Sequence, residues 1–134
     1  MNILIVEDSL LERLLLSYLL SNGGLGKLTI KTCDSVESAK RVCVDFFPEI
    51  VLLDLTLSYQ EDYPFVLTQI PIFAKFAKVV VISGTFDITG VSKAVLDAGA
   101  VKFISKICLR PQALVEDIKE VCALPSPRGI PFLG

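Results

Sequence analysis

Short apolar runs alternate with stretches of helical spacing along almost the whole chain, and this alternation limits the folds open to it. Between the runs, apolar residues recur at helical intervals, as at Leu11, Leu14, Leu15 and Tyr18. Regular alternation of strands and helices predicts one α/β domain with a parallel sheet and helices on both of its faces. The runs have strand length and are rich in β-branched residues: Ile3–Val6, Leu28–Thr32, Ile50–Leu53, Val79–Ile82 and Val101–Ile104.

Prolines and glycines mark where this domain is expected to end and where its helices are bounded. Pro111 suits the first turn of the last helix. The third helix is expected somewhere within 63–75, although Pro64 and Pro71 interrupt its pattern. Residues 124–134 contain three prolines and two glycines, which is typical of a linker or tail. We therefore predict a domain over residues 1–123 and a tail over 124–134.

Composition and charge exclude several classes of function. The longest uncharged run, 14–26, is too short for a membrane span, and the first apolar run leads directly to carboxylates instead of a signal-peptide cleavage site. We therefore expect a soluble, cytoplasmic protein that does not enter a membrane. The net charge is −2 and the basic residues are dispersed, which argues against direct nucleic-acid binding.

The cysteine pattern and the absence of histidine narrow the chemistry further. The four cysteines are widely spaced and the sequence has no histidine, so we expect reduced packing residues rather than a zinc site. Without histidine, the Ser-His-Asp and Cys-His arrangements are also excluded. Any chemistry must use carboxylates, lysine and hydroxyl groups. The cysteines are Cys33, Cys43, Cys108 and Cys122.

Reactive side chains stand at the ends of four of the five predicted strands: Glu7 with Asp8, then Asp54, Ser83 and Lys106. Each alone has a structural explanation, such as a helix cap for Asp8, a turn for Ser83 or a solvated charge for Lys106. Ligands of parallel sheets bind beyond the carboxyl ends of the strands, so the set together predicts one site.

The charges of this set indicate a metal ion. Asp54 ends an apolar run, where an unpartnered carboxylate is costly. Glu7, Asp8 and Asp54 carry three negative charges and Lys106 one positive, which leaves −2. Mg²⁺ balances that charge and prefers oxygen ligands. An acidic pocket with one lysine and one hydroxyl suits phosphoryl transfer, in which positioning and charge neutralisation dominate.

The sequence resembles the receiver domains of two-component response regulators over residues 2 to about 123. This resemblance implies a CheY-like, flavodoxin-like (βα)5 fold whose parallel strands have the order 2-1-3-4-5. The matching segments are Ile-Leu-Ile-Val-Glu7-Asp8-Ser, Val-Leu-Leu-Asp54-Leu, Val-Val-Ile-Ser83-Gly, Ala98-Gly99-Ala100 and Lys102-Phe103-Ile-Ser-Lys106.

The resemblance also implies roles for the acidic residues. Asp54 would accept a phosphoryl group from a phosphohistidine of a sensor histidine kinase or a histidine phosphotransfer protein. Asp8 would bind Mg²⁺ directly and Glu7 through water, with Asp54 and the backbone carbonyl of Thr56 completing the protein's ligands.

Further implied roles concern the switch and its lifetime. Lys106 and Ser83 would contact phosphoryl oxygens, and Phe103 would move inward as Ser83 shifts. The face formed by the fourth helix, the fifth strand and the fifth helix would then bind a downstream protein or a second copy. Thr56 and Thr85 would tune the lifetime of the acyl phosphate.

Two departures from the family pattern and two other functions remain open. The loop 56–64 lacks the usual sequence after the acceptor, and Ile107 replaces a proline whose preceding peptide bond is commonly cis.

One alternative function is that of a degenerate receiver that acts as an adaptor without phosphate. The other is a phosphatase of the haloacid-dehalogenase type, although Thr56 stands where that family has its second aspartate.

Overall fold

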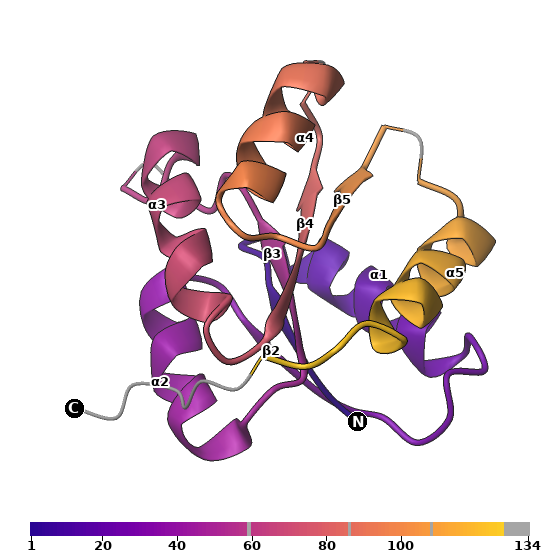
Figure 1. Ribbon diagram of the computed structural model, residues 1–134. Coiled ribbons are helices and arrows are strands. Elements are labelled where there is room, and N and C mark those ends of the chain that lie inside the picture. Colours follow the sequence, from indigo (N-terminus) through magenta and orange to yellow (C-terminus); the bar gives the residue numbers. More distant parts are fainter. Residues whose placement is uncertain (59, 86, 108, 128–134) are drawn as a thin grey trace.

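The computed structural model describes residues 1–58, 60–85, 87–107 and 109–127, and within them strands and helices alternate as predicted (Figure 1). Each predicted strand is present, with ends that differ by no more than one residue from the expected ones. The elements are β1 (Asn2–Val6), α1 (Leu10–Ser21), β2 (Thr29–Cys33), α2 (Val36–Phe46), β3 (Ile50–Asp54), α3 (Tyr63–Phe73), β4 (Lys78–Ser83), α4 (Ile88–Asp97), β5 (Lys102–Ser105) and α5 (Pro111–Cys122).

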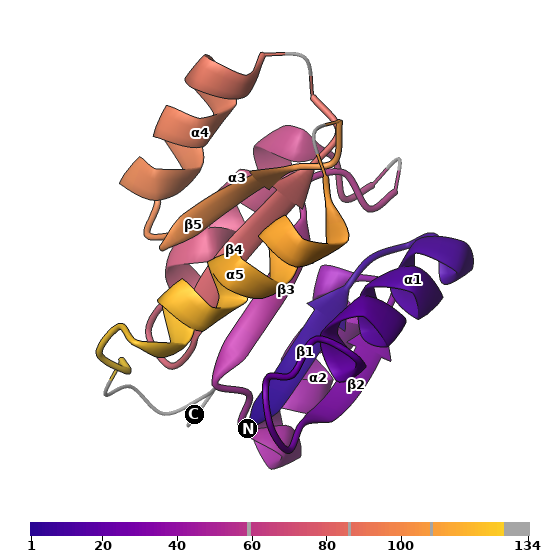
Figure 2. The same cartoon turned by 90° about the vertical axis from the view of Figure 1, so that its right-hand side faces the viewer.

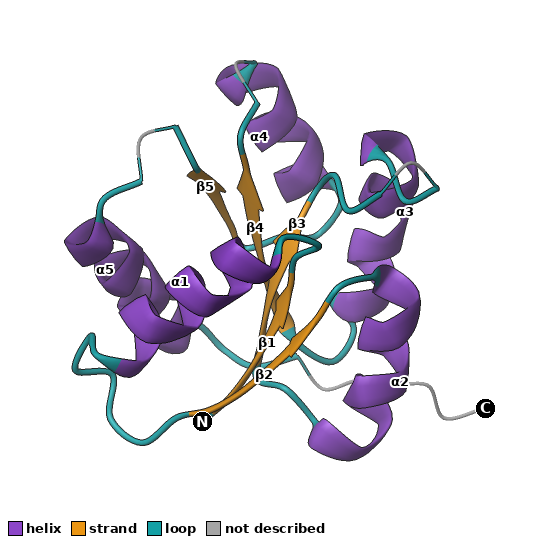
Figure 3. Ribbon diagram, turned by 180° about the vertical axis from the view of Figure 1, so that it is seen from behind, coloured by secondary structure: helices purple, strands orange, loops and turns teal. Residues whose placement is uncertain are grey.

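The strands form one parallel sheet in the order β2-β1-β3-β4-β5 (Figure 3). This is the predicted order 2-1-3-4-5, so the predicted α/β fold is confirmed. The chain leaves β1 toward one edge and returns through β3 toward the other, which places the reversal of strand order between β1 and β3. Their carboxyl ends, where Glu7 and Asp54 stand, therefore flank the crevice in which such sheets bind ligands.

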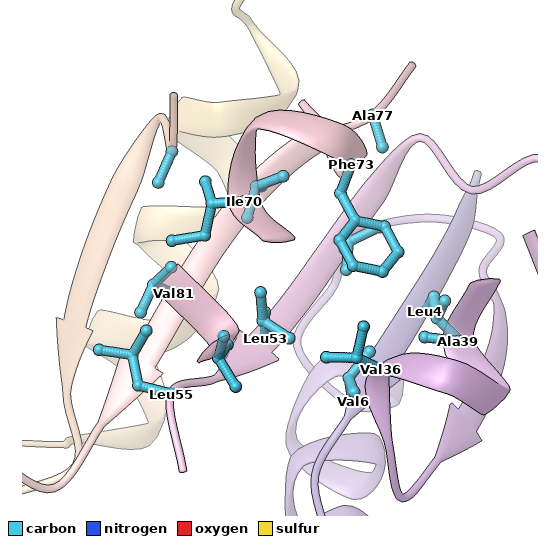
Figure 4. Close-up of a cluster of buried hydrophobic side chains, with 14 of the residues drawn as sticks. Leu4, Val6, Val36, Ala39, Leu53, Leu55, Ile70, Phe73, Ala77 and Val81 are labelled. Carbon is cyan, nitrogen blue, oxygen red and sulfur yellow. The ribbon is translucent and has the colours of Figure 1, made fainter. Parts of the chain in front are cut away.

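Side chains alternate between the two faces of the sheet and build a separate core on each. On the face covered by α2, α3 and α4, Leu4, Val6, Leu53 and Val81 pack against helix residues that include Phe73 (Figure 4). Helices α1 and α5 lie on the opposite face (Figure 2). Their buried side chains pack there against the intervening strand positions. These include Ile3, Ile5, Ile50, Leu52, Val80, Ile82 and Ile104. Because β1, β3 and β4 are covered on both sides, they read as continuous apolar runs.

Helix α3 begins inside the expected stretch and continues through Pro71. The Asp62 carboxylate caps it by accepting a hydrogen bond from the Phe65 N–H at 3.1 Å. Pro71 lacks an N–H and so cannot donate within the helix. Packing of Ile70 and Phe73 against the sheet holds the helix beyond this point, since both side chains are fully buried.

Helix α1 covers the sheet with only part of its apolar surface. Leu16 and Leu20 are buried, whereas Leu10, Leu11, Leu14, Leu15 and Tyr18 are each at least half exposed. Of the predicted helical stripe, Leu11, Leu14, Leu15 and Tyr18 therefore face solvent, whereas its fifth member, Leu19, packs against the core. This helix therefore has more apolar residues than it buries in the core.

The structure adds to the expectations for the cysteines. Cys43 is buried and Cys33 half-buried, and burial raises the pKa of both thiols to about 12, so both stay protonated at neutral pH. Cys122 is exposed, so core packing does not explain it, and Cys108 lies outside the described residues.

The described residues include no helix with the length and apolarity that a bilayer crossing demands. Residues 124–127 form neither helix nor strand, and 128–134 lie outside the described part. The predicted division into a domain and a tail after residue 123 therefore stays a prediction.

Candidate functional site

The predicted reactive side chains meet at the carboxyl edge of the sheet, because the strands that carry them are parallel. Glu7 follows β1, Asp54 ends β3, Ser83 ends β4 and Lys106 follows β5. A pocket of about 650 Å³ opens at this edge. Its lining residues come from strand ends, loops and the first turns of helices: Glu12, Asp54, Thr56, Tyr63, Ser83, Gly84, Thr85, Asp87, Val91 and Lys106.

The Lys106 ammonium group lies at the centre of three carboxylates. Its Nζ donates hydrogen bonds to Glu7 Oε2 at 2.8 Å, to Asp54 Oδ2 at 3.0 Å and to Glu12 Oε2 at 3.1 Å. Glu7 and Asp54 are buried, whereas the Glu12 side chain is 42% exposed. A lysine ammonium has three donors, so this arrangement uses all of them.

The same carboxylates form a group that can hold a metal ion. Glu7, Glu12 and Asp54 each offer an oxygen within 4.8 Å of the others. Carboxylate oxygens are the donors that Mg²⁺ prefers, so the donor set fits that ion. Lys106 already supplies one positive charge to this group.

Sequence reasoning missed Glu12. The pattern Ser9-Leu-Leu-Glu12 matches a capping box, in which the glutamate would bind the backbone N–H of the serine. Half of the box is present, since Ser9 Oγ accepts a hydrogen bond from the Glu12 N–H at 3.3 Å. The Ser9 N–H instead donates to Glu7 Oε1 at 3.2 Å. The Glu12 carboxylate therefore contacts Lys106 instead of the Ser9 N–H. The spacing of residues in the sequence could not show this contact.

Burial and charge shift the pKa values of this cluster. Burial, reinforced by the nearby Asp54 carboxyl, raises the pKa of Glu7 to about 9. Burial also acts to lower the pKa of Lys106, but its hydrogen bonds with Glu7 and Asp54 outweigh this and raise it. Burial and the Asp54 carboxyl thus favour the protonated form of Glu7, and the neighbouring carboxyl groups favour the charged form of Lys106.

The positions of Asp8 and Thr56 differ from those of the buried acids. Asp8 is exposed and stands outside the group of acids that converge on Lys106 in the described part of the chain. Thr56 lines the pocket, and its backbone N–H donates to Asp54 Oδ1 at 3.2 Å. Direct metal binding by Asp8 and by the Thr56 carbonyl stays a prediction.

The residues implied in switching lie beside the cluster. Ser83 is buried, its Oγ accepts from the Thr85 N–H at 3.3 Å, and its carbonyl accepts from the Lys106 N–H at 2.8 Å. Thr85 Oγ1 accepts from the N–H of Asp87, the cap of α4. Phe103 is half-buried against the core beneath α2, α3 and α4. Their roles in switching and in phosphate lifetime stay predictions.

The substitution of Ile107 for the family's proline does not displace Lys106. The peptide bond between them is trans, as are the others among the described residues. The Ile107 N–H donates to Ser105 Oγ at 3.2 Å, which closes the turn after β5. Lys106 nevertheless reaches Asp54.

Comparisons with known proteins give a result at the level of structure. No protein-family model and no curated protein sequence matches the chain. Among solved structures, the receiver domain of NtrX from Brucella abortus is similar, with a TM-score of 0.77, 26% identity, and coverage of 92% of this chain and 99% of that one.

Two further solved structures support the same conclusion. A response regulator from Thermotoga maritima has a TM-score of 0.75 at 21% identity and covers 92% of this chain and 98% of its own. A CheY-like receiver domain protein from Methanospirillum hungatei JF-1 has a TM-score of 0.72 at 22% identity, with coverage of 90% and 91%. The resemblance read from the strand-end motifs is therefore confirmed, and the chain has the fold of the response-regulator receiver domains.

Proposed function

We propose that this chain is a response-regulator receiver that accepts a phosphoryl group on Asp54 in the presence of Mg²⁺. The observation that supports this most is the environment of the Asp54 carboxylate. One of its oxygens accepts from Lys106 and the other from the Thr56 N–H, at the base of an open pocket that Ser83 also lines. These two hydrogen bonds fix the orientation of the carboxylate.

The proposed transfer begins when a phosphohistidine of a partner protein enters the pocket. An Asp54 oxygen attacks phosphorus, an O–P bond forms, and the N–P bond to the donor imidazole breaks. Lys106 remains beside the acceptor and neutralises charge on the phosphoryl oxygens, while Ser83 supplies a hydroxyl at the pocket wall. A bound Mg²⁺ would supply further neutralisation, and its proposed ligands are Glu7, Asp8, Asp54 and the backbone carbonyl of Thr56. Glu7 and Asp54 belong to the group of carboxylates that could hold an ion.

The donor is proposed to be a sensor histidine kinase or a histidine phosphotransfer protein, acting in the cytoplasm. These 134 residues include no histidine, so the donor histidine lies outside them. Such a partner must approach over the pocket mouth, which the exposed apolar face of α1 borders. Leu15 on that face lines a small cavity together with Glu12 and Lys106. Apolar surface of this kind fits a protein partner.

The downstream surface is proposed to be the face formed by α4, β5 and α5. Ser83 is joined to the end of β5 by the hydrogen bond from the Lys106 N–H, and Phe103 lies within β5. A phosphoryl group that draws on the Ser83 hydroxyl and Lys106 would therefore act on this face. A downstream protein or a second copy of the chain is the proposed ligand.

The test is incubation with a small acyl phosphate and Mg²⁺, with the Asp54→Asn variant as control. The proposal expects stoichiometric labelling of the wild type, loss of labelling in chelator, and none in Asp54→Asn, whose folding should be unchanged. No labelling of a folded wild type would favour the adaptor alternative. Continuous release of phosphate would favour a phosphatase, and labelling of Asp54→Asn would refute the assignment of the acceptor.

A further inference from the structure

The Lys106 ammonium group has three N–H donors, and this number limits how it can bind a phosphoryl group on Asp54. Each of its three N–H groups is directed at a different carboxylate. A phosphoryl group on Asp54 would bring new oxygens to this ammonium group. Lys106 must then weaken at least one present bond, so the three carboxylates compete with the incoming phosphoryl oxygens.

Glu12 is the competitor that can move. Glu7 is 1% exposed and Asp54 6%, and each is further held by a backbone N–H, from Ser9 and Thr56 respectively. Glu12 comes from the first turn of α1, and its side chain is 42% exposed. A rotation about its side-chain bonds would return its carboxylate to water without leaving a buried charge.

Its position also opposes the product electrostatically. The carboxylate oxygens of Glu12 and Asp54 lie within 4.8 Å of each other, and both residues line the same pocket. An acyl phosphate on Asp54 would add negative charge to this pocket. Glu12 forms an ion pair with Lys106 at 3.1 Å, so both anions would draw on the same ammonium group.

We propose that Glu12 is an internal competitor of the phosphoryl group: its carboxylate occupies Lys106 in the resting protein and is displaced when Asp54 is phosphorylated. Glu12 is thus a positioning residue that holds the ammonium group and weakens binding of the product anion. The inference rests on the proposed function and adds a restraint on the same site.

The experiment measures binding of beryllium fluoride, a tetrahedral mimic of the phosphoryl group, by calorimetry at saturating Mg²⁺. Glu12→Gln keeps the size of the side chain and suits a first helical turn, but removes the charge. We expect it to bind the mimic about fivefold more tightly than wild type, the size expected for a partly exposed ion pair. Glu12→Ala should tighten binding in the same direction, which separates loss of the anion from gain of an amide donor.

A matched control is Glu37→Gln, which removes one charge from the exposed Glu37–Arg41 pair on α2. It should bind the mimic as wild type does. Mg²⁺ binding is measured separately, because a residue that serves chiefly as a metal ligand would lose Mg²⁺ affinity on substitution. Thermal unfolding of each variant verifies that the fold is retained.

The outcomes separate this inference from the proposed function. If wild type binds the mimic but both Glu12 variants bind it equally or more weakly, the competitor role is refuted while the receiver function stands. Tightening by Glu12→Gln alone would also refute it, because the gain would then come from the new amide. If wild type binds neither the mimic nor a phosphoryl group at saturating Mg²⁺, the proposed function itself fails.

Discussion

Replacing Glu7 with glutamine should change how the stability of the metal-free protein depends on pH. The folded protein holds the pKa of Glu7 at about 9, against an ordinary value of 4.5. Between these values the folded chain binds one more proton than the unfolded chain. Stability is therefore fully present below pH 4.5 and is lost progressively as the pH rises toward 9.

The size of the effect follows from that single proton. Each pH unit inside the window costs up to about 1.4 kcal/mol, so raising the pH from 6 to 8 should cost the wild type at most about 2.7 kcal/mol. Glu7→Gln has a similar shape and resembles the protonated carboxyl, and it cannot ionise. Its free energy of unfolding should stay nearly level over the same range.

The assay is urea unfolding followed by circular dichroism at pH 6, 7 and 8 in chelator. Glu37→Gln is the control, since Glu37 is exposed and lies outside the cluster, and it should keep the wild-type slope. Parallel pH profiles for wild type and Glu7→Gln would refute the reasoning, because the extra proton would then not reside on this carboxyl group. A change in the urea dependence itself would show that the unfolding reaction had changed.

Three other outcomes are expected from the site and the fold. Ser83→Ala should still accept phosphate from a small donor but lose phosphate-dependent partner binding or dimerisation, measured by sedimentation; unchanged binding would contradict the coupling. The hydroxyl groups of Thr56 and Thr85 are weak bases, so the acyl phosphate should decay slowly. Thr85→Glu or Thr56→Asn should speed the loss of label, whereas decay of the wild type within seconds would contradict the expected slow hydrolysis. Lys78→Met should lower the free energy of unfolding by about 1–3 kcal/mol. The buried ammonium group of Lys78 donates to the Val121 carbonyl at 3.0 Å and to the Cys122 carbonyl at 3.3 Å. An unchanged free energy in urea unfolding would show that water replaces the ammonium group at these carbonyls.

The fold was predictable because its signal is carried by many residues at once. The β-branched runs had to be strands that are covered on both faces, and the helical spacing between them required parallel pairing. Placement of Asp54, Ser83 and Lys106 at one edge then followed from the parallel direction of the strands, without knowledge of any contact.

The details that sequence reasoning missed depend on the reach of single side chains. Glu12 looks like part of a capping box, and only the competing bond from Ser9 to Glu7 sends it to Lys106. Lys78 fell outside the predicted strand because that strand was drawn from the apolar run Val79–Ile82 alone. Its side chain instead crosses to the last turn of α5, a contact that spans more than forty positions of sequence.

The contact of Lys78 has a mechanical consequence for the domain. Strand β4 is tied to the pocket at Ser83 and to the final turn of α5 at Lys78. Its six residues extend about 20 Å, so these two attachments lie at opposite ends of the sheet. A displacement of β4 along its axis would pull directly on the carbonyl groups that end α5. Residues 124–127 follow that turn, so such a displacement would act at the point where they leave α5.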